Sequence, residues 1–482
     1  MATLSLPHQP NLEQLRKQAR ELQRGVRSGD AAALAVAGLD RPVAGFVLAQ
    51  AQTTIARRYG FASWARLRRH VEAIGERTWV YSDATDTDEP AAIFLRLACL
   101  NFENDGVERR RRAGALRADH PDLMSVSVGA AAACADAERV RQHLNREPAA
   151  ARRPSGPYGW SPLMYAAYAR VDAPRDAAMT TVRLLLDAGA DPNDGRFFAG
   201  LPTPFTVLTG VFGGTGEEQP PHEHALDLAR LLLERGADPN DGQTLYNRMF
   251  GPADDFLEIL FDFGLGEGDG GPWRRRLPDL IPDPVTQLRG LLEWAVVHDQ
   301  RARVHLLAGH GVDIVSPLPH CGTAVEVALR NGHRRLAGEL LEHGAAAPAL
   351  DSVDQFIAAA LAGDAREVSA ADRSVIAAAQ RSRPALVVWA AGQERIDAVG
   401  LLVAAGFDVN ALGRSDLPLE QKWQTALHTA VERDNAEMAR RLLDLGADCS
   451  MRDLRFDGTP LDWAHHLGRP NLVALLSGES AR

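Results

Sequence analysis

Residues 210–224 hold the side chains of this sequence that are best suited to chemistry. His222 and His224 flank Glu223, and alternate residues on an extended chain can bind a metal ion from one side. A zinc site needs three or four protein ligands, and no third ligand can be assigned to this pair. We therefore interpret both histidines as loop residues, and we expect no metal and no other cofactor.

Other catalytic patterns are incomplete. The glycines of residues 210–224 lack the preceding strand and the Gly-Lys-Ser/Thr ending of a phosphate loop. Neither Gly-x-Ser-x-Gly nor His-Glu-x-x-His occurs. Cys321 adjoins His320, whereas a nucleophile and its base are rarely neighbours in sequence. We assign no catalytic residues and favour a protein without enzymatic activity, and a small-molecule or metal-dependent enzyme built on residues 197–284 is the alternative.

Aromatic and polar side chains in the same part of the chain suit a binding surface. Tyr and Arg are favoured at binding hot spots, and Tyr246 stands two residues before Arg248. The opposite interpretation, that Tyr246 and Met249 fill a core, is equally open. The candidate binding residues are Tyr158, Trp160, Phe212, His222, His224, Tyr246, Asn247 and Arg248.

A repeated phrase shows which elements must position these residues. A Leu pair, two variable residues, Gly, a small residue and Asp recur at 185–191, 232–238 and 442–448. The Leu pair closes an apolar helix face, and the Gly stops the helix in a left-handed conformation that only Gly adopts without strain. Looser copies begin at Leu306, Leu340 and Leu401.

Helix starts accompany these helix ends. Ser or Thr caps a helix start, and Pro is well tolerated in the first turn. The sequence therefore predicts starts at Ser161-Pro162, Thr203-Pro204, Thr425-Ala426 and Thr459-Pro460. Start and end together define a repeating pair of helices.

The spacing of the phrase gives the period. The stop glycines 189, 236, 264, 311, 344, 406 and 446 are separated by 47, 28, 47, 33, 62 and 40 residues. These steps centre on about 33 residues if the step of 62 holds two repeats and the steps of 47 carry insertions. From about Leu123 to the C-terminus the chain resembles the ankyrin-repeat family. The segment 352–381 has neither phrase, and we interpret it as a degenerate repeat.

The resemblance implies an all-α fold, an α-solenoid of about nine stacked helix pairs with β-turn fingers along a concave side. It also implies that His428, in Thr-Ala-Leu-His, bonds the backbone of a neighbouring finger. We expect an N-terminal helical module at 1–80, a linker at 81–90, a capping helical pair at 91–122 and the repeat array at 123–482.

Three insertions, near 171–179, 210–224 and 264–284, interrupt the period. Insertions in repeat proteins become loops on one face, which is frequently the binding face. We therefore predict a protein–protein interaction scaffold that binds a protein partner through the concave finger side and these loops.

The N-terminal module is predicted from two apolar helix faces and its charge. Leu12, Leu15, Ala19 and Leu22 form one face, and a second lies on Trp64, Leu67, Val71 and Ile74, with a third helix at 43–59 between them. From these faces we expect a small helical bundle. Two segments, 11–19 and 59–67, resemble a module that precedes ankyrin arrays in bacterial proteins, which implies an organisation rather than an activity. Residues 1–80 hold 12 Lys and Arg against 6 Asp and Glu.

Nucleic-acid association through that basic module is a further alternative. It would use Arg57, Arg58, Arg66, Arg68 and Arg69. We favour a solvated helix face instead, and we interpret Arg109–Arg112 in the same way.

Composition agrees with a protein of the cytoplasm. Cys99, Cys134, Cys321 and Cys449 lie far apart without paired spacing, which predicts neither a disulfide framework nor a structural zinc site. No signal-peptide pattern and no apolar run of membrane-spanning length occurs. The excess of arginine over lysine suggests a GC-rich bacterial genome.

Overall fold

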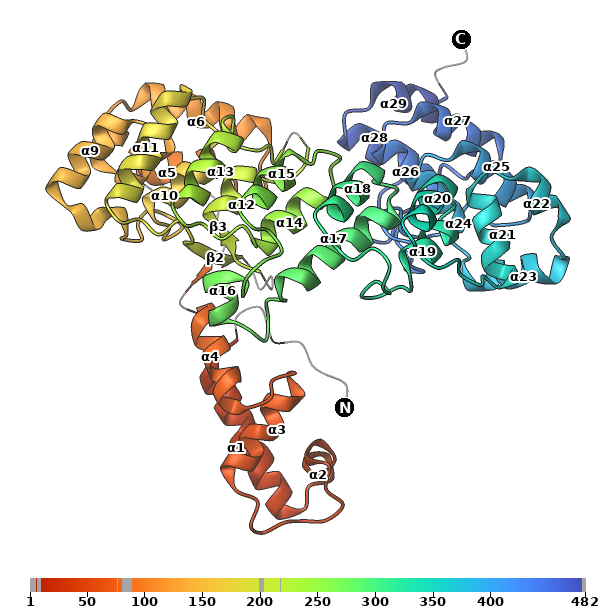
Figure 1. Cartoon of the computed structure of the whole chain (residues 1–482), viewed down its shortest axis with the longest axis horizontal. Coiled ribbons are helices and arrows are strands. Elements are labelled where there is room, and N and C mark those ends of the chain that lie inside the picture. The colour runs from red at the N-terminus through yellow and green to blue at the C-terminus, as the bar shows by residue number, and fades with distance from the viewer. Residues whose placement is uncertain are drawn as a thin grey trace. The chain divides into compact units, whose positions relative to one another are not determined.

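The computed structural model describes residues 6, 10–75, 77–79, 89–198, 203–216 and 218–478. The predicted linker at 81–90 lies almost entirely outside them. The described chain is mostly helical, and its contacts divide it into two compact units, Met1–Leu288 and Arg289–Arg482 (Figure 1). Among the described residues, no helix is both long enough and apolar enough to cross a membrane.

The first unit begins with four helices, and further helices and three short strands follow. The N-terminal helices are α1 (Leu12–Ser28), α2 (Ala31–Ala37), α3 (Leu48–Arg58) and α4 (Trp64–Gly75). The strands are β1 (Thr78–Trp79), β2 (Gly195–Phe198) and β3 (Phe205–Thr206). The helices that follow are α5 (Pro90–Ala98), α6 (Val107–Asp119), α7 (Leu123–Val126), α8 (Val128–Ala133), α9 (Ala137–Arg146), the 3-10 helix η1 (Pro148–Ala151), α10 (Pro162–Tyr168), α11 (Arg175–Asp187), α12 (Val207–Phe212), α13 (Ala225–Glu234), α14 (Gly242–Met249), α15 (Asp255–Asp262) and α16 (Gly271–Arg276).

Helix α17 (Pro284–Val297) runs from the last residues of the first unit into the second. The second unit then contains α18 (Arg301–Gly309), α19 (Ala324–Arg330), α20 (Arg334–Glu342), α21 (Ser352–Leu361), α22 (Ala365–Ala370), α23 (Arg373–Ser382), α24 (Leu386–Gly392), α25 (Ile396–Ala404), α26 (Ala426–Glu432), α27 (Ala436–Asp444), α28 (Pro460–His466) and α29 (Pro470–Leu476). The segment 352–381 therefore forms three helices where two were predicted.

The predicted helix ends and most of the predicted starts are confirmed. All seven stop glycines have a left-handed backbone, with φ between 79° and 91°. The hydroxyls of Ser161, Thr425 and Thr459 accept hydrogen bonds from backbone N–H groups in the first turns of α10, α26 and α28. The start at Thr203 was wrong by three residues, because Phe205 pairs with β2 and Thr206 is the residue that caps α12.

Successive helix pairs pack side by side in both units. In the first unit α8, α10, α12 and α14 contact one another in that order, and α9, α11, α13 and α15 form a second row. In the second unit α24, α26 and α28 form one row and α25, α27 and α29 another. Each row buries apolar side chains against the other, so every pair needs its neighbours to complete its core.

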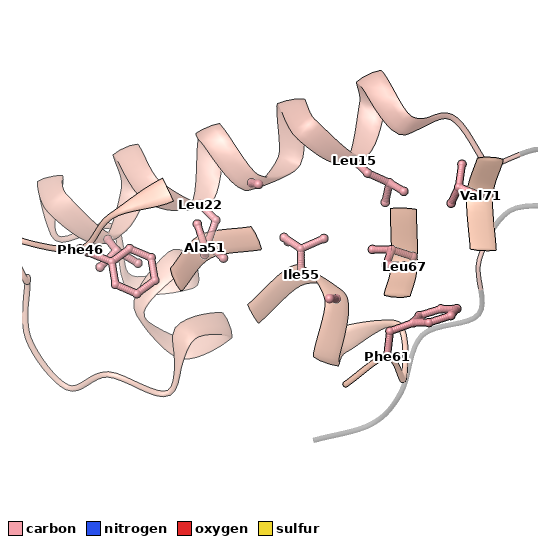
Figure 2. Close-up of a cluster of buried hydrophobic side chains, with 11 residues drawn as sticks. Leu15, Leu22, Phe46, Ala51, Ile55, Phe61, Leu67 and Val71 are labelled. Atoms are coloured by element: carbon pink, nitrogen blue, oxygen red, sulfur yellow. The ribbon is translucent and has the colours of Figure 1, made fainter. Parts of the chain in front are cut away.

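The N-terminal helices share a separate apolar cluster. Leu15 and Leu22 of α1 face Ala51 and Ile55 of α3, and Leu67 of α4 completes the cluster (Figure 2). The third helix begins at residue 48 rather than 43, and α2 was not predicted, since its seven residues show no amphipathic period.

The fold also contains strands that an all-α prediction lacks. β1 pairs in parallel with β2, which pairs antiparallel with β3. Trp79 of β1 contacts Trp160, Phe198 and Phe205. The residues preceding α12 are therefore held in extended form by an aromatic cluster.

Candidate functional site

The loop at 210–224 is fixed by hydrogen bonds from arginine and asparagine side chains. Arg170 donates to the carbonyl oxygens of Pro220 (2.8 Å) and Gly210 (2.7 Å). Arg110 donates to Glu218 O at 3.0 Å, and Arg248 donates to Gly214 O at 2.8 Å. These donors come from three separate parts of the first unit, so the described part of the loop, which omits residue 217, is tied down.

His222 and His224 have structural partners within this loop. The ring Nδ1 of His222 accepts a hydrogen bond from the backbone N–H of His224 at 3.1 Å. The Nε2 of His224 lies 2.8 Å from the carbonyl oxygen of Ala173. Burial first, and then the positive charge of Arg170, lower the pKa of His222 to about 3. No group of three or more His, Cys, Asp or Glu side chains suited to a metal ion occurs among the described residues.

Three candidate binding residues lie inside the first unit. Trp160 is fully buried, and Tyr158 and Phe212 are almost as buried. Trp160 contacts the rings of Tyr158, Tyr165 and Tyr168, and Phe212 contacts the ring of Phe256. Their rings pack helices and are not exposed to a partner.

The remaining candidates lie on α14. Asn247 donates to Gly213 O at 3.4 Å and Arg248 to Gly214 O, so both support the loop. Tyr246 is 54% exposed and contacts the ring of Phe250. Of the eight candidates, Tyr246 offers the most exposed aromatic surface.

A small cavity lies between Asn193, Asp241 and Trp273, and most of its lining belongs to the region 197–284 proposed for an alternative enzyme. Its volume of about 20 Å³ has room for roughly one water molecule. Asp241 beside it caps α14 and accepts hydrogen bonds from Thr206, Thr209 and Thr244. Burial raises the pKa of Asp241 while these hydrogen bonds oppose the shift.

The neighbouring His320 and Cys321 do not form a nucleophile–base pair. His320 Nδ1 lies 3.1 Å from the carboxylate of Glu293. Burial and the negative charge of Glu293 raise the pKa of the Cys321 thiol to about 12. The thiolate that a cysteine nucleophile requires is therefore disfavoured.

The arginine runs have partly structural roles. Arg66 pairs with Asp279 and Arg68 with Glu72, while Arg57, Arg58 and Arg69 have no ion-pair partner among the described residues. Arg109 and Arg110 donate to backbone carbonyls, so only Arg111 and Arg112 are exposed as we expected for that run.

An open groove that the sequence analysis missed lies in the second unit over α26 and α28. Its volume is about 590 Å³, which is within the usual range of ligand-binding pockets. Two chain segments wall it: residues 413–424, closed by backbone pairing of Gly413 with Gln424, and residues 453–458. The residues that line it are Ser415, Asp416, Trp423, Gln424, Glu432, Arg455, Phe456, Gly458, Asp462, Trp463, His466 and Leu467.

Asp453 holds one wall of this groove. Its buried carboxylate accepts hydrogen bonds from the backbone N–H groups of Arg455, Phe456 and Gly458, at 2.7 to 2.9 Å. It also accepts the indole N–H of Trp463 at 2.9 Å. One carboxylate thus shapes the 453–458 turn and orients a groove tryptophan.

The two walls are joined, and histidines brace them. Leu454 N–H donates to Trp423 O at 2.8 Å. His428 Nε2 lies 3.0 Å from Gly458 O, so this histidine bonds the backbone of a neighbouring turn. His298 Nε2 lies 2.8 Å from Asp416 O on the other wall.

Aromatic rings and the guanidinium of Arg455 form part of the groove surface, and Arg414 lies just outside it. The guanidinium of Arg414 lies 4.0 Å from the ring centre of Trp423, and that of Arg455 lies 4.4 Å from it. Phe456 is 68% exposed and meets Trp463 edge to face. Only 6% of the residues are aromatic, so three aromatic residues within 423–463 could have indicated a binding surface here. The sequence analysis missed it because it looked for binding surfaces at the insertions.

The helix pairs and their left-handed glycine ends define a helical repeat protein. Residues 402–464 match the family described as ankyrin repeats (many copies), and residues 158–195 match the family described as ankyrin repeat. No curated protein matches the chain. These two segments of the chain are therefore ankyrin repeats. The 402–464 match covers most of the groove, and ankyrin repeats are generally protein–protein interaction modules.

Proposed function

We propose that this protein is a non-catalytic scaffold that binds a protein partner. In this proposal the helix pairs within each unit stack as an α-solenoid with β-turn fingers, and the N-terminal helices form a small bundle. The single observation that carries the proposal is the open aromatic groove between residues 413–424 and 453–458, which both lie in matched ankyrin sequence. In this proposal these two stretches are the finger segments.

The groove has the features of a binding hot spot. Exposed Phe456 and half-buried Trp423 supply large, rigid apolar surface, and Arg455 lies against both rings. Tryptophan and arginine are enriched at energetically important positions of interfaces. The loop 210–224 contributes less ring surface, because Phe212 is buried and the loop carbonyls are already bonded.

Site-specific photo-cross-linking tests this placement. A photoreactive phenylalanine analogue replaces Phe456, Tyr246 or Leu341, one position per variant, in the full chain. Leu341 is the control, because it is an exposed apolar residue at 39% exposure outside the groove of the same unit. We expect cross-linked proteins at position 456 well above the level at 341.

The outcomes separate the two surfaces. Strong cross-linking at 246 together with background at 456 would move the interface to α14 and its loop. Background at all three positions in extracts of the source organism would contradict a scaffold that binds through either surface.

A further inference from the structure

The charged groups of the groove are mostly acidic. Three carboxylates line it, from Asp416, Glu432 and Asp462, against the single guanidinium of Arg455. Asp416 is paired with Arg414 just outside the lining. Neither Glu432 nor Asp462 forms an ion pair within the described part of the chain. The charge of Arg452 acts on Asp462, but Arg452 is itself paired with Asp457.

Neutral donors fix the first of these carboxylates. Gln424 Nε2 lies 3.0 Å from Glu432 Oε2, and the hydroxyl of Ser415 lies 3.4 Å from the same atom. Gln424 is itself buried, and Glu432 stays exposed at the end of α26. The carboxylate is therefore positioned while its charge is left uncompensated.

The second carboxylate is held ionised at the start of α28. Thr459 donates its backbone N–H and its hydroxyl to Asp462 Oδ2, each at 2.8 Å. These two hydrogen bonds lower the pKa of Asp462. A negative charge near a helix N-terminus is also favoured by the helix dipole.

Apolar surface lies beside the two charges. Phe456 and Leu467 line the groove with 68% and 39% of their surface exposed, and Leu454, in the same 453–458 segment as Phe456, is 62% exposed. Exposed apolar patches of this kind mark interaction sites in proteins. The groove thus combines an apolar wall with fixed negative charge.

We propose that the groove binds a linear peptide segment in which a bulky apolar or aromatic side chain lies next to lysine or arginine. The inference rests on the proposed scaffold function and names its partner class. The apolar side chain packs against Phe456 and Trp463, and the cation faces Glu432 and Asp462. An acidic segment would bring like charges together, which costs binding free energy and so gives selectivity.

Peptide selection tests which class of peptide the groove binds. A random library of displayed dodecapeptides is selected on the immobilised full chain. Peptides are selected on the unchanged protein and then sorted by whether Phe456→Ala abolishes their binding. Leu341→Ala is the matched control, because it removes an exposed apolar side chain away from the groove. We expect the Phe456-dependent peptides to carry net positive charge and at least one bulky apolar residue.

A charge substitution gives the second measurement. For a synthesised Phe456-dependent peptide, Glu432→Gln should weaken binding about two- to fivefold, as for an exposed ion pair. Glu437→Gln on α27, an exposed glutamate outside the groove, should leave the dissociation constant unchanged. Added salt should reduce the difference between Glu432→Gln and the unchanged protein.

Two negative results are distinguishable. Phe456-dependent peptides that are neutral or acidic, or that are indifferent to Glu432→Gln, would overturn the basic partner class while the scaffold function stands. If no selected peptide depended on Phe456, both the partner class and the groove as interface would be overturned.

Discussion

The loop at 210–224 and the finger segments at 413–424 and 453–458 both depart from a bare helix–turn–helix repeat, yet they use their extra residues differently. In the loop, Arg170, Asn247 and Arg248 donate to backbone carbonyls, and Phe212 is buried. In the fingers, Asp453 bonds the turn from within while Phe456 stays exposed. An insertion can serve the fold alone, whereas a surface for a partner must leave apolar side chains uncovered.

The direction of the hydrogen bonds accounts for this difference. Loop carbonyls accept hydrogen bonds from Arg170, which follows α10, and from Arg248 of α14, so side chains outside the loop hold it in place. In the 453–458 turn, Asp453 of the turn itself accepts the backbone N–H groups of Arg455, Phe456 and Gly458, and Phe456 stays exposed on the groove side.

Substituting one phenylalanine in each region should give the largest difference in the free energy of unfolding. Phe212→Ala should lower the free energy of unfolding by about 3–5 kcal/mol, because it empties a fully packed position. Phe456→Ala should change it by less than about 0.5 kcal/mol, because that ring is 68% exposed. Urea unfolding of both variants measures the two changes in the free energy of unfolding. A large loss from Phe456→Ala would mean that its ring is a core element and not a free surface.

Asp453→Ala should destabilise the 453–458 wall of the groove. Four hydrogen bonds to one buried carboxylate are lost, and such charged bonds suggest a destabilisation of about 3 kcal/mol. Thermal unfolding gives the loss, with Asp444→Ala, an exposed carboxylate on α27, as the control. Peptide binding by Asp453→Ala at a temperature where it is folded should also fall. Unimpaired binding would show that the wall is shaped by other contacts.

Arg170→Met tests whether the loop at 210–224 is held by its neighbours. The apolar stem is kept, but the donors to Pro220 and Gly210 are removed, and we expect a loss of about 2 kcal/mol. Amide hydrogen exchange should speed up at His222, whose N–H donates to Val211 O. Arg175→Met, at an exposed ion pair with Asp227, should leave that exchange rate unchanged. Equal protection in both variants would mean that Arg170 is not needed to hold the loop.

The sequence predicted the repeat units well, because their ends depend on local chemistry. Each stop glycine and three of the four caps act within a few residues of their own helix. Exposure depends instead on distant contacts. Trp160 and Phe456 are both aromatic residues in turn segments, but Trp160 is covered by Trp79, from another element, which no local pattern indicates. The start at Thr203 failed for the same reason, since β2 holds the residues before α12 extended.

Acid should loosen the 210–224 loop more than the finger segments. His222 has a pKa of about 3 in the fold and about 6.5 when unfolded. Between pH 6.5 and pH 3, His222 therefore binds a proton in the opened or unfolded loop but not in the folded one. The stability that neutral His222 gives to the folded loop is complete above pH 6.5 and is lost as the pH falls. The loss is at most about 1.4 kcal/mol per pH unit, and opening of the loop alone limits it further.

Hydrogen exchange at the His224 amide, which donates to His222 Nδ1, measures this effect at pH 7 and pH 5 after correction for intrinsic rates. His222→Gln keeps an acceptor but does not titrate, and it should remove the extra opening at pH 5. His466→Gln, at an exposed groove residue, should not alter it. An opening that persists in His222→Gln would assign the acid sensitivity to another group and remove the contrast in pH response between the two regions.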